Sequence, residues 1–166
     1  MLKHFNAVLL LVLSCNVAAM PELTTVGQGT YRYLFWQIYD ARLATADGTF
    51  SNYQQSTPLL LELTYKRDIS VQQFVDSTVD EWQKLGHISA EQQASWARLL
   101  LNIWQDVKQG DTLAALLQPS GSVLFYHNGK EGGAIDDQRF GPAFFDIWLH
   151  PNTSAPDLRR KLIAAR

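Results

Sequence analysis

LLLELTYKRDISVQQFVDSTVDEWQKLG, residues 59–86, contains a point where the spacing of apolar side chains changes from two to about 3.6 residues. Residues 59–65 alternate as a strand with one buried face does. After the charged joint 66–70, apolar residues recur at steps of three and four, which is the pattern of an amphipathic helix. Ser70 and Gln73 form a capping box, so we expect the helix to begin directly after Ser70.

The segment that precedes this strand has apolar residues at both odd and even positions. Residues 30–43 are rich in aromatic and branched side chains, which predicts one interior strand that is covered on each face. Residues 44–57 are polar and include Asp47-Gly48, so we expect a loop or a weak hairpin there.

Two further helices are marked by residues that can cap them. Ser89 and Gln92 form a second capping box, and the apolar stripe that follows predicts a helix that ends at Gly110. Asp136 or Asp137 is expected to cap the next helix, because carboxylates are favoured at a helix N-terminus.

The remaining C-terminal segments indicate the fold class. Strands are predicted over 112–118, 123–127 and 130–135, and a last helix is predicted from Ser154. Strands that follow one another as hairpins, together with helices that have one apolar stripe, predict an α+β domain. We expect an antiparallel sheet with helices gathered on one face.

The first residues read as an export signal. Lys3 precedes a short apolar run, and small residues end the segment at Ala19, which predicts a signal peptide over 1–19 and a single mature domain over 20–166. The expected location is the periplasm. A lipoprotein is the alternative, in which the only cysteine, Cys15, is lipidated and anchors the chain. After ordinary cleavage no cysteine remains, so packing alone holds the mature fold.

Charge and motif content exclude several functional classes. The chain has 14 Lys and Arg against 16 Asp and Glu, which makes nucleic acid an unsuitable partner. His87, His127 and His150 lie far apart without companions at metal-ligand spacing, so we predict no metal and no cofactor. No transmembrane segment is expected in 20–166. The sequence leaves the oligomeric state open.

Several segments, in order along nearly the whole mature chain, carry a resemblance to a known family. They are 26–29 (VGQG), 39–43 (YDARL), 61–70 (LELTYKRDIS), 81–86 (EWQKLG), 110–111 (GD), 125–129 (FYHNG) and 144–149 (FFDIWL). With these motifs the chain resembles the chalcone isomerase-like superfamily, and in particular its bacterial exported members. The resemblance implies an open-faced β-sandwich, in which a layer of helices covers an antiparallel sheet and a ligand cleft lies between the layers.

The chain departs from the catalytic residues of plant chalcone isomerases. Those enzymes use an arginine, two threonine-type hydroxyls, a tyrosine and an asparagine. The resemblance places the tyrosine position at Ser70 and the asparagine position at Ser77, and the first threonine position falls near Tyr39. A seryl hydroxyl does not reach as far into a cleft as a phenol or an amide. The resemblance therefore argues against the plant reaction, and no catalytic residue is predicted.

Relatives that bind fatty acids imply a different role for an arginine. They hold the carboxylate with an arginine on the first long strand, and Arg32 is the candidate here. By parity Arg32 is expected on an apolar strand face, where a guanidinium can meet an anionic head group. Tyr31, Tyr33 and Tyr39 are the expected supporting donors or walls. The alternative is an arginine at a strand end whose charge reaches solvent or pairs with a carboxylate.

Three functions follow from these expectations. The first is an exported, non-catalytic protein that holds a hydrophobic carboxylate, such as a fatty acid, between the sheet and the helices. The second is an isomerase or intramolecular lyase that acts on another substrate, for which the fold alone is the argument. The third is an envelope interaction module whose cleft is filled by its own side chains.

Overall fold

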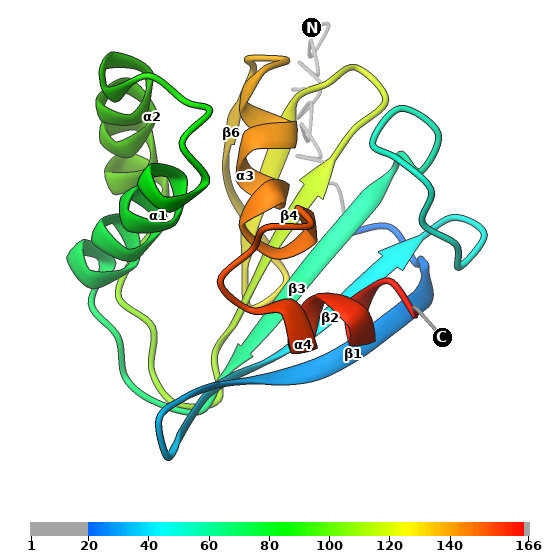
Figure 1. The fold of residues 1–166 in the computed structure, drawn as a ribbon, viewed down its shortest axis with the longest axis horizontal. Helices are drawn as coiled ribbons and strands as arrows, with labels where there is room; N and C mark the ends of the chain where they lie inside the picture. Colours follow the sequence, from blue (N-terminus) through cyan, green and yellow to red (C-terminus); the bar gives the residue numbers. More distant parts are fainter. Residues whose placement is uncertain (1–19, 165–166) are drawn as a thin grey trace, which may run out of the picture.

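The computed structural model describes residues 20–164, which form one six-stranded sheet and four helices (Figure 1). Neighbouring strands are antiparallel and pair in chain order. The strands are β1 (Thr24–Tyr33), β2 (Trp36–Thr45), β3 (Leu59–Tyr65), β4 (Thr112–Leu117), β5 (Val123–His127) and β6 (Lys130–Ile135). The predicted strands at 123–127 and 130–135 are confirmed.

The predicted signal peptide over 1–19, with Cys15 inside it, lies outside the described residues. Within 20–164, no helix combines the length and the apolarity that crossing a bilayer requires.

The N-terminal strands form a hairpin that the sequence pattern did not reveal. One interior strand over 30–43 was expected, but the chain turns at Leu34 and Phe35 between β1 and β2. Leu34 adopts a φ of 54°. Glycine and asparagine are the usual residues at such a position, and an apolar pair gave no sign of a turn. The expectation of a single strand was therefore wrong.

The helices follow the predicted caps with two corrections. They are α1 (Val71–Leu85), α2 (Ala90–Ile103), α3 (Phe140–Leu149) and α4 (Pro156–Leu162). Ser70 accepts a hydrogen bond from the Gln73 N–H at 3.3 Å, and the Gln73 side chain accepts one from the Ser70 N–H at 3.0 Å. The predicted capping box at the start of α1 is confirmed.

The first correction concerns the end of α2, which is at Ile103 and not at Gly110. Beyond it, Val107 exchanges two backbone hydrogen bonds with Ile69, at 2.9 and 3.0 Å. Val107 is buried beside this bridge and lies outside α2. In the sequence it continues the apolar pattern of α2, so the helix was predicted to end too late. The bridge ties the β3–α1 joint to the connection that follows α2.

The second correction concerns the start of α3. Its N-cap is Arg139, without a side-chain cap. Asp137 accepts a hydrogen bond from the Arg139 N–H at 3.0 Å and another from the Trp96 indole N–H at 3.2 Å. Asp137 therefore links the start of α3 to α2, and neither it nor Asp136 serves as the cap.

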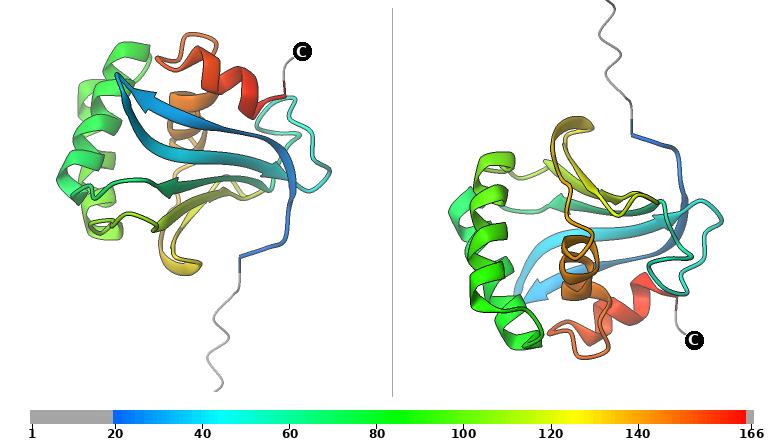
Figure 2. Two further views of the ribbon diagram at one scale, coloured as in Figure 1. Left: turned by 90° about the horizontal axis from the view of Figure 1, so that it is seen from below. Right: turned by 90° about the horizontal axis from the view of Figure 1, so that it is seen from above.

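The helices form one layer, and the main core lies between this layer and the sheet. α3 lies over the centre of the sheet, α4 packs on β1 and β2, and α1 and α2 lie side by side (Figure 1). The sheet twists strongly around α3 (Figure 2). A smaller apolar cluster occupies the opposite sheet face. The predicted class, an α+β open-faced β-sandwich, is confirmed.

Candidate functional site

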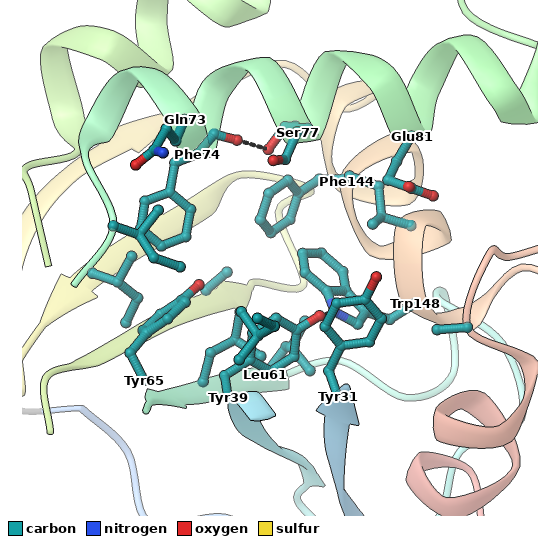
Figure 3. A pocket seen from close by; sticks show the side chains of 18 of the residues that line it. Tyr31, Tyr39, Leu61, Tyr65, Gln73, Phe74, Ser77, Glu81, Phe144 and Trp148 are labelled. Atoms are coloured by element: carbon teal, nitrogen blue, oxygen red, sulfur yellow. Dashed lines mark hydrogen bonds between the residues drawn. The ribbon is translucent and has the colours of Figure 1, made fainter. Parts of the chain in front are cut away.

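A cavity of about 670 Å³ lies between α1, α3 and the helix-facing side of the sheet. Its wall is mainly aromatic and aliphatic, and Figure 3 shows these side chains below α1. The residues that form much of this wall include Tyr39, Leu61, Phe74, Trp104, Phe144 and Trp148. A cavity of this size and lining is typical of sites for hydrophobic small molecules. The cleft is therefore not filled by the protein's own side chains.

Three tyrosines form a row across neighbouring strands at the floor of the cavity. Tyr31 on β1 pairs in register with Tyr39 on β2, which pairs with Tyr65 on β3. The ring centroids of Tyr31 and Tyr39 are 5.1 Å apart and stacked, and those of Tyr39 and Tyr65 are 5.6 Å apart, edge to face. Register and ring packing together fix all three side chains on the cavity side.

The three hydroxyls have different partners. The Tyr39 hydroxyl accepts a hydrogen bond from the Trp148 indole N–H at 2.9 Å. The hydroxyls of Tyr31 and Tyr65 have no hydrogen-bond partner among residues 20–164, and in that range no side-chain polar atom is fully buried without a partner. Both hydroxyls point toward α1 across the cavity (Figure 3). They are free to bond to a ligand.

The environment keeps these phenols protonated. Burial raises the pKa values of Tyr39 and Tyr65 well above the ordinary tyrosine value. Burial, followed by the negative charge of Glu81, raises the pKa of Tyr31. Neutral phenols donate hydrogen bonds and do not act as bases or nucleophiles. The row therefore supplies hydrogen-bond donors.

Charged side chains occur at the rim of the cavity. Lys84 forms an ion pair with Glu81, with an Nζ to Oε1 distance of 2.6 Å. Arg67 also lines the cavity, and its guanidinium carbon lies 4.5 Å from the centre of the Trp36 ring. Arg67 takes part in no ion pair within the described residues. It is thus the rim cation whose charge is available to a ligand.

Most of the residues that the sequence brought into consideration line the cavity, but Ser70 does not. Tyr31, Tyr33 and Tyr39 line it, and so does Ser77 on α1. Ser70 is not part of the wall, because its hydroxyl caps α1.

Arg32 does not face the cavity. It is exposed, lies opposite Gln37 in the hairpin, and is absent from the cavity wall. Tyr31 and Tyr33 flank it on β1, and their cavity-lining positions leave the intervening side chain on the opposite side of the strand. The expected placement of Arg32 in the cleft was wrong, because the parity argument assumed one straight strand through the turn at Leu34.

Sequence reasoning missed Tyr65 and Arg67 as site residues. Tyr65 was expected on the same strand face as Leu61 and Leu63, which do line the cavity. That alternation was a usable signal, but only the strand register shows that Tyr65 continues the row of Tyr31 and Tyr39.

The rings of His87 and His150 stack with their centroids 5.6 Å apart, and His127 lies apart from them on β5. His87 contacts Asp146 at 3.2 Å and His127 contacts Asp111 at 3.3 Å. Among residues 20–164, no three His, Cys, Asp or Glu side chains are grouped as metal ligands would be.

Comparisons with known proteins agree with this architecture. A protein of Haemophilus influenzae described as uncharacterized is 25% identical over 148 residues, which are 89% of this chain and 71% of that protein. The crystal structure of an Arabidopsis thaliana fatty-acid binding protein superposes with a TM-score of 0.64 at 9% identity, covering 92% of this chain and 95% of that chain. A family model described as chalcone isomerase-like matches residues 17–164. Since that match spans the sheet, all four helices and the cavity between them, the chain belongs to the chalcone isomerase-like family.

Proposed function

We propose that the chain binds a hydrophobic carboxylate, such as a fatty acid, in the cavity between the sheet and α1, without catalysis. The observation that carries this proposal is a cavity of about 670 Å³ with an aromatic wall and two free tyrosine hydroxyls. Neutral phenols suit binding, because they donate hydrogen bonds without offering a base. The likeness of the fold to that of a protein named as a fatty-acid binding protein supports the same ligand class.

One cation at the rim, Arg67, can compensate the charge of an acidic head group, although the acids Asp68, Asp80 and Glu81 line the cavity as well. Lys84 is already neutralised by Glu81, whereas Arg67 is free of carboxylate partners in the described chain. A carboxylate that accepts hydrogen bonds from the Tyr65 hydroxyl and faces the Arg67 guanidinium has its charge compensated at the rim. Its alkyl chain then lies along the aromatic wall, where burial of apolar surface drives binding.

The proposed place of binding is the periplasm. The support is the sequence of 1–19, in which Lys3, an apolar run and terminal small residues follow one another as in a signal peptide.

Filling the cavity should weaken ligand binding. Ser77→Phe places a large ring into the cavity from an exposed position on α1, so the expected loss of affinity for palmitate is at least about tenfold with little change in folding. Displacement of a fluorescent fatty-acid analogue measures the affinity. Gln83→Phe is the matched control, since Gln83 is exposed on the same helix and outside the cavity wall. Equal affinities of the two variants would contradict the proposed site.

The role of the carboxylate is tested by removing the free cation. Arg67→Gln should weaken the binding of palmitate about tenfold and leave the binding of methyl palmitate unchanged, because only the acid carries a charge for Arg67 to compensate. Isothermal titration of both ligands measures the difference. A parallel loss for the acid and the ester would assign Arg67 a packing role, and an unchanged palmitate affinity would remove it from the site.

A further inference from the structure

The turn between β1 and β2 exposes an unusual amount of apolar surface. We call residues 33–36 the hairpin tip. Tyr33, Leu34, Phe35 and Trp36 are 61%, 74%, 93% and 58% exposed. The tip extends beyond the rest of the described chain, at the lower edge of Figure 1. Among residues 20–164, the other exposed large apolar side chains are Leu99 and Leu101 on α2, at 43% and 38%. Contiguous exposed apolar residues of this kind mark an interaction site.

The backbone of the tip also departs from what stability favours. Leu34 has a φ of 54°, which glycine adopts without a steric penalty and a leucine does not. Leu34 therefore strains the backbone and also exposes apolar surface to water. An exposed leucine in this backbone conformation points to a role in contact with a partner.

The charges near the tip are positive. Arg32 and Arg67 take part in no ion pair with any described residue, and Arg67 lies over the Trp36 ring. The nearest acidic side chains along these strands are already paired, Asp40 with Lys66 at 2.5 Å and Asp68 with Lys108 at 3.3 Å. Two cations without an ion pair among the described residues thus lie near the tip, although the chain as a whole has a net charge of −2.

The tip adjoins the cavity. Tyr33 and Arg67 belong both to the tip region and to the cavity wall. Because Tyr33 is 61% exposed while it lines the cavity, the cavity opens to solvent beside the tip.

We propose that the hairpin tip inserts into the surface of a membrane that contains anionic lipids, with the cavity mouth turned toward the bilayer. Aromatic side chains next to arginines are typical of the membrane interface, where rings enter the headgroup region and guanidinium groups contact phosphates. A protruding two-residue turn can enter the headgroup region of a fluid bilayer. It offers far less area than the roughly 1,200–2,000 Å² that a specific protein interface buries.

Docking adds a membrane step to the proposed ligand binding and does not require a ligand. A failure of docking leaves the Ser77→Phe experiment in solution unaffected. Conversely, Ser77→Phe should bind vesicles as the wild type does, so the two proposals can fail independently.

The test uses tryptophan fluorescence of the full chain with vesicles of phosphatidylcholine and about 30% phosphatidylglycerol that carry bromine on their acyl chains. Trp36 lies in the tip, Trp82, Trp96 and Trp148 are buried in the core, and Trp104 is half-buried in the cavity wall. We expect the vesicles to quench the Trp36 emission. In Trp36→Phe most of the quenching should be lost while vesicle co-sedimentation persists, and any remainder comes from Trp104 in the cavity wall. Every variant keeps residues 1–19, so any membrane affinity of that segment is common to all.

The apolar and the charged contributions are separated by further variants. Leu34→Gly/Phe35→Ser should bind vesicles at least about tenfold more weakly without a lower Tm, because glycine suits the positive φ of the turn. Arg32→Gln should weaken binding several-fold to anionic vesicles and not to phosphatidylcholine alone. Leu99→Ser/Leu101→Ser is the matched control and should bind as the wild type does.

Results of two kinds, from lipid binding and from self-association, would overturn the proposal. The first is unchanged vesicle binding in Leu34→Gly/Phe35→Ser, or emission of the wild type that the brominated lipids do not quench. The second is self-association of the wild type that the tip variant abolishes, without any lipid quenching, which would identify a second copy of the chain as the partner.

Discussion

Gly27→Ala should destabilise the fold by about 3 kcal/mol or more, as measured by urea unfolding. Gly27 lies on β1 directly beneath α4. A Cβ at this position would lie 2.5 Å from the Leu162 carbonyl oxygen and closer still to that of Lys161. Both atoms belong to the backbone of the last turn of α4, so no side-chain rotation relieves the overlap. The helix must shift, and its buried residues Leu158 and Leu162 then lose their packing on the sheet.

Gly132→Ala is the matched control for this clash. Gly132 also lies on a strand, and the nearest atom to an added Cβ is the Ile103 carbonyl oxygen at 3.6 Å, an ordinary contact. Its stability should stay within about 0.5 kcal/mol of the wild type. If both variants unfolded alike, the general effect of replacing a strand glycine would explain the loss, and the α4 contact would not.

Patterns of neighbouring residues predicted most of the helices and strands. They failed at the β1–β2 turn and at the end of α2, which short sequence motifs do not mark. The N-caps at Ser70 and Ser89 placed the starts of two helices, because a cap is made by residues close in sequence. Only Ser70 forms the full capping box, since Ser89 accepts from the Gln92 N–H without the reciprocal side-chain bond. The β1–β2 turn was missed, since Leu34 has a backbone conformation that its side chain does not favour. The end of α2 was misplaced, because the bridge between Val107 and Ile69 joins segments far apart in the chain.

The site was less predictable than the fold. Tyr31, Tyr33 and Tyr39 were candidates and do line the cavity, whereas Arg32 was placed on the wrong side of its strand. Alternation assigns a residue to one face of a strand only when the ends of the strand are known. Because the β1–β2 turn was missed, Arg32 was assigned to the wrong face. The available cation, Arg67, lies in the joint after β3. Its lack of an ion-pair partner among the described residues is a three-dimensional property that no spacing reveals.

Trp82→Ala should be the most destabilising single change in α1, with an expected loss of about 4 kcal/mol. Trp82 is fully buried, and its ring packs against Trp96 on α2 and Phe140 on α3, with centroids 5.5 and 6.2 Å away. Its indole N–H donates a hydrogen bond to the Ala143 carbonyl at 2.9 Å. Truncation leaves a cavity at the junction of three helices and removes a buried hydrogen bond. Equilibrium unfolding in urea measures the loss.

Trp82→Phe separates the two contributions, because it keeps an aromatic ring and removes the donor. We expect it to lose about 1–3 kcal/mol, less than Trp82→Ala, because it removes the hydrogen bond to the Ala143 carbonyl and keeps most of the ring packing. Trp36→Ala, at a site that is 58% exposed, should change stability by less than about 1 kcal/mol and serves as the control. Trp82 also holds α1 over the cavity, so Trp82→Ala should weaken palmitate binding even at temperatures where the chain stays folded. Undiminished binding by folded Trp82→Ala would show that α1 keeps its position through its contacts with α2 and the β3–α1 joint alone.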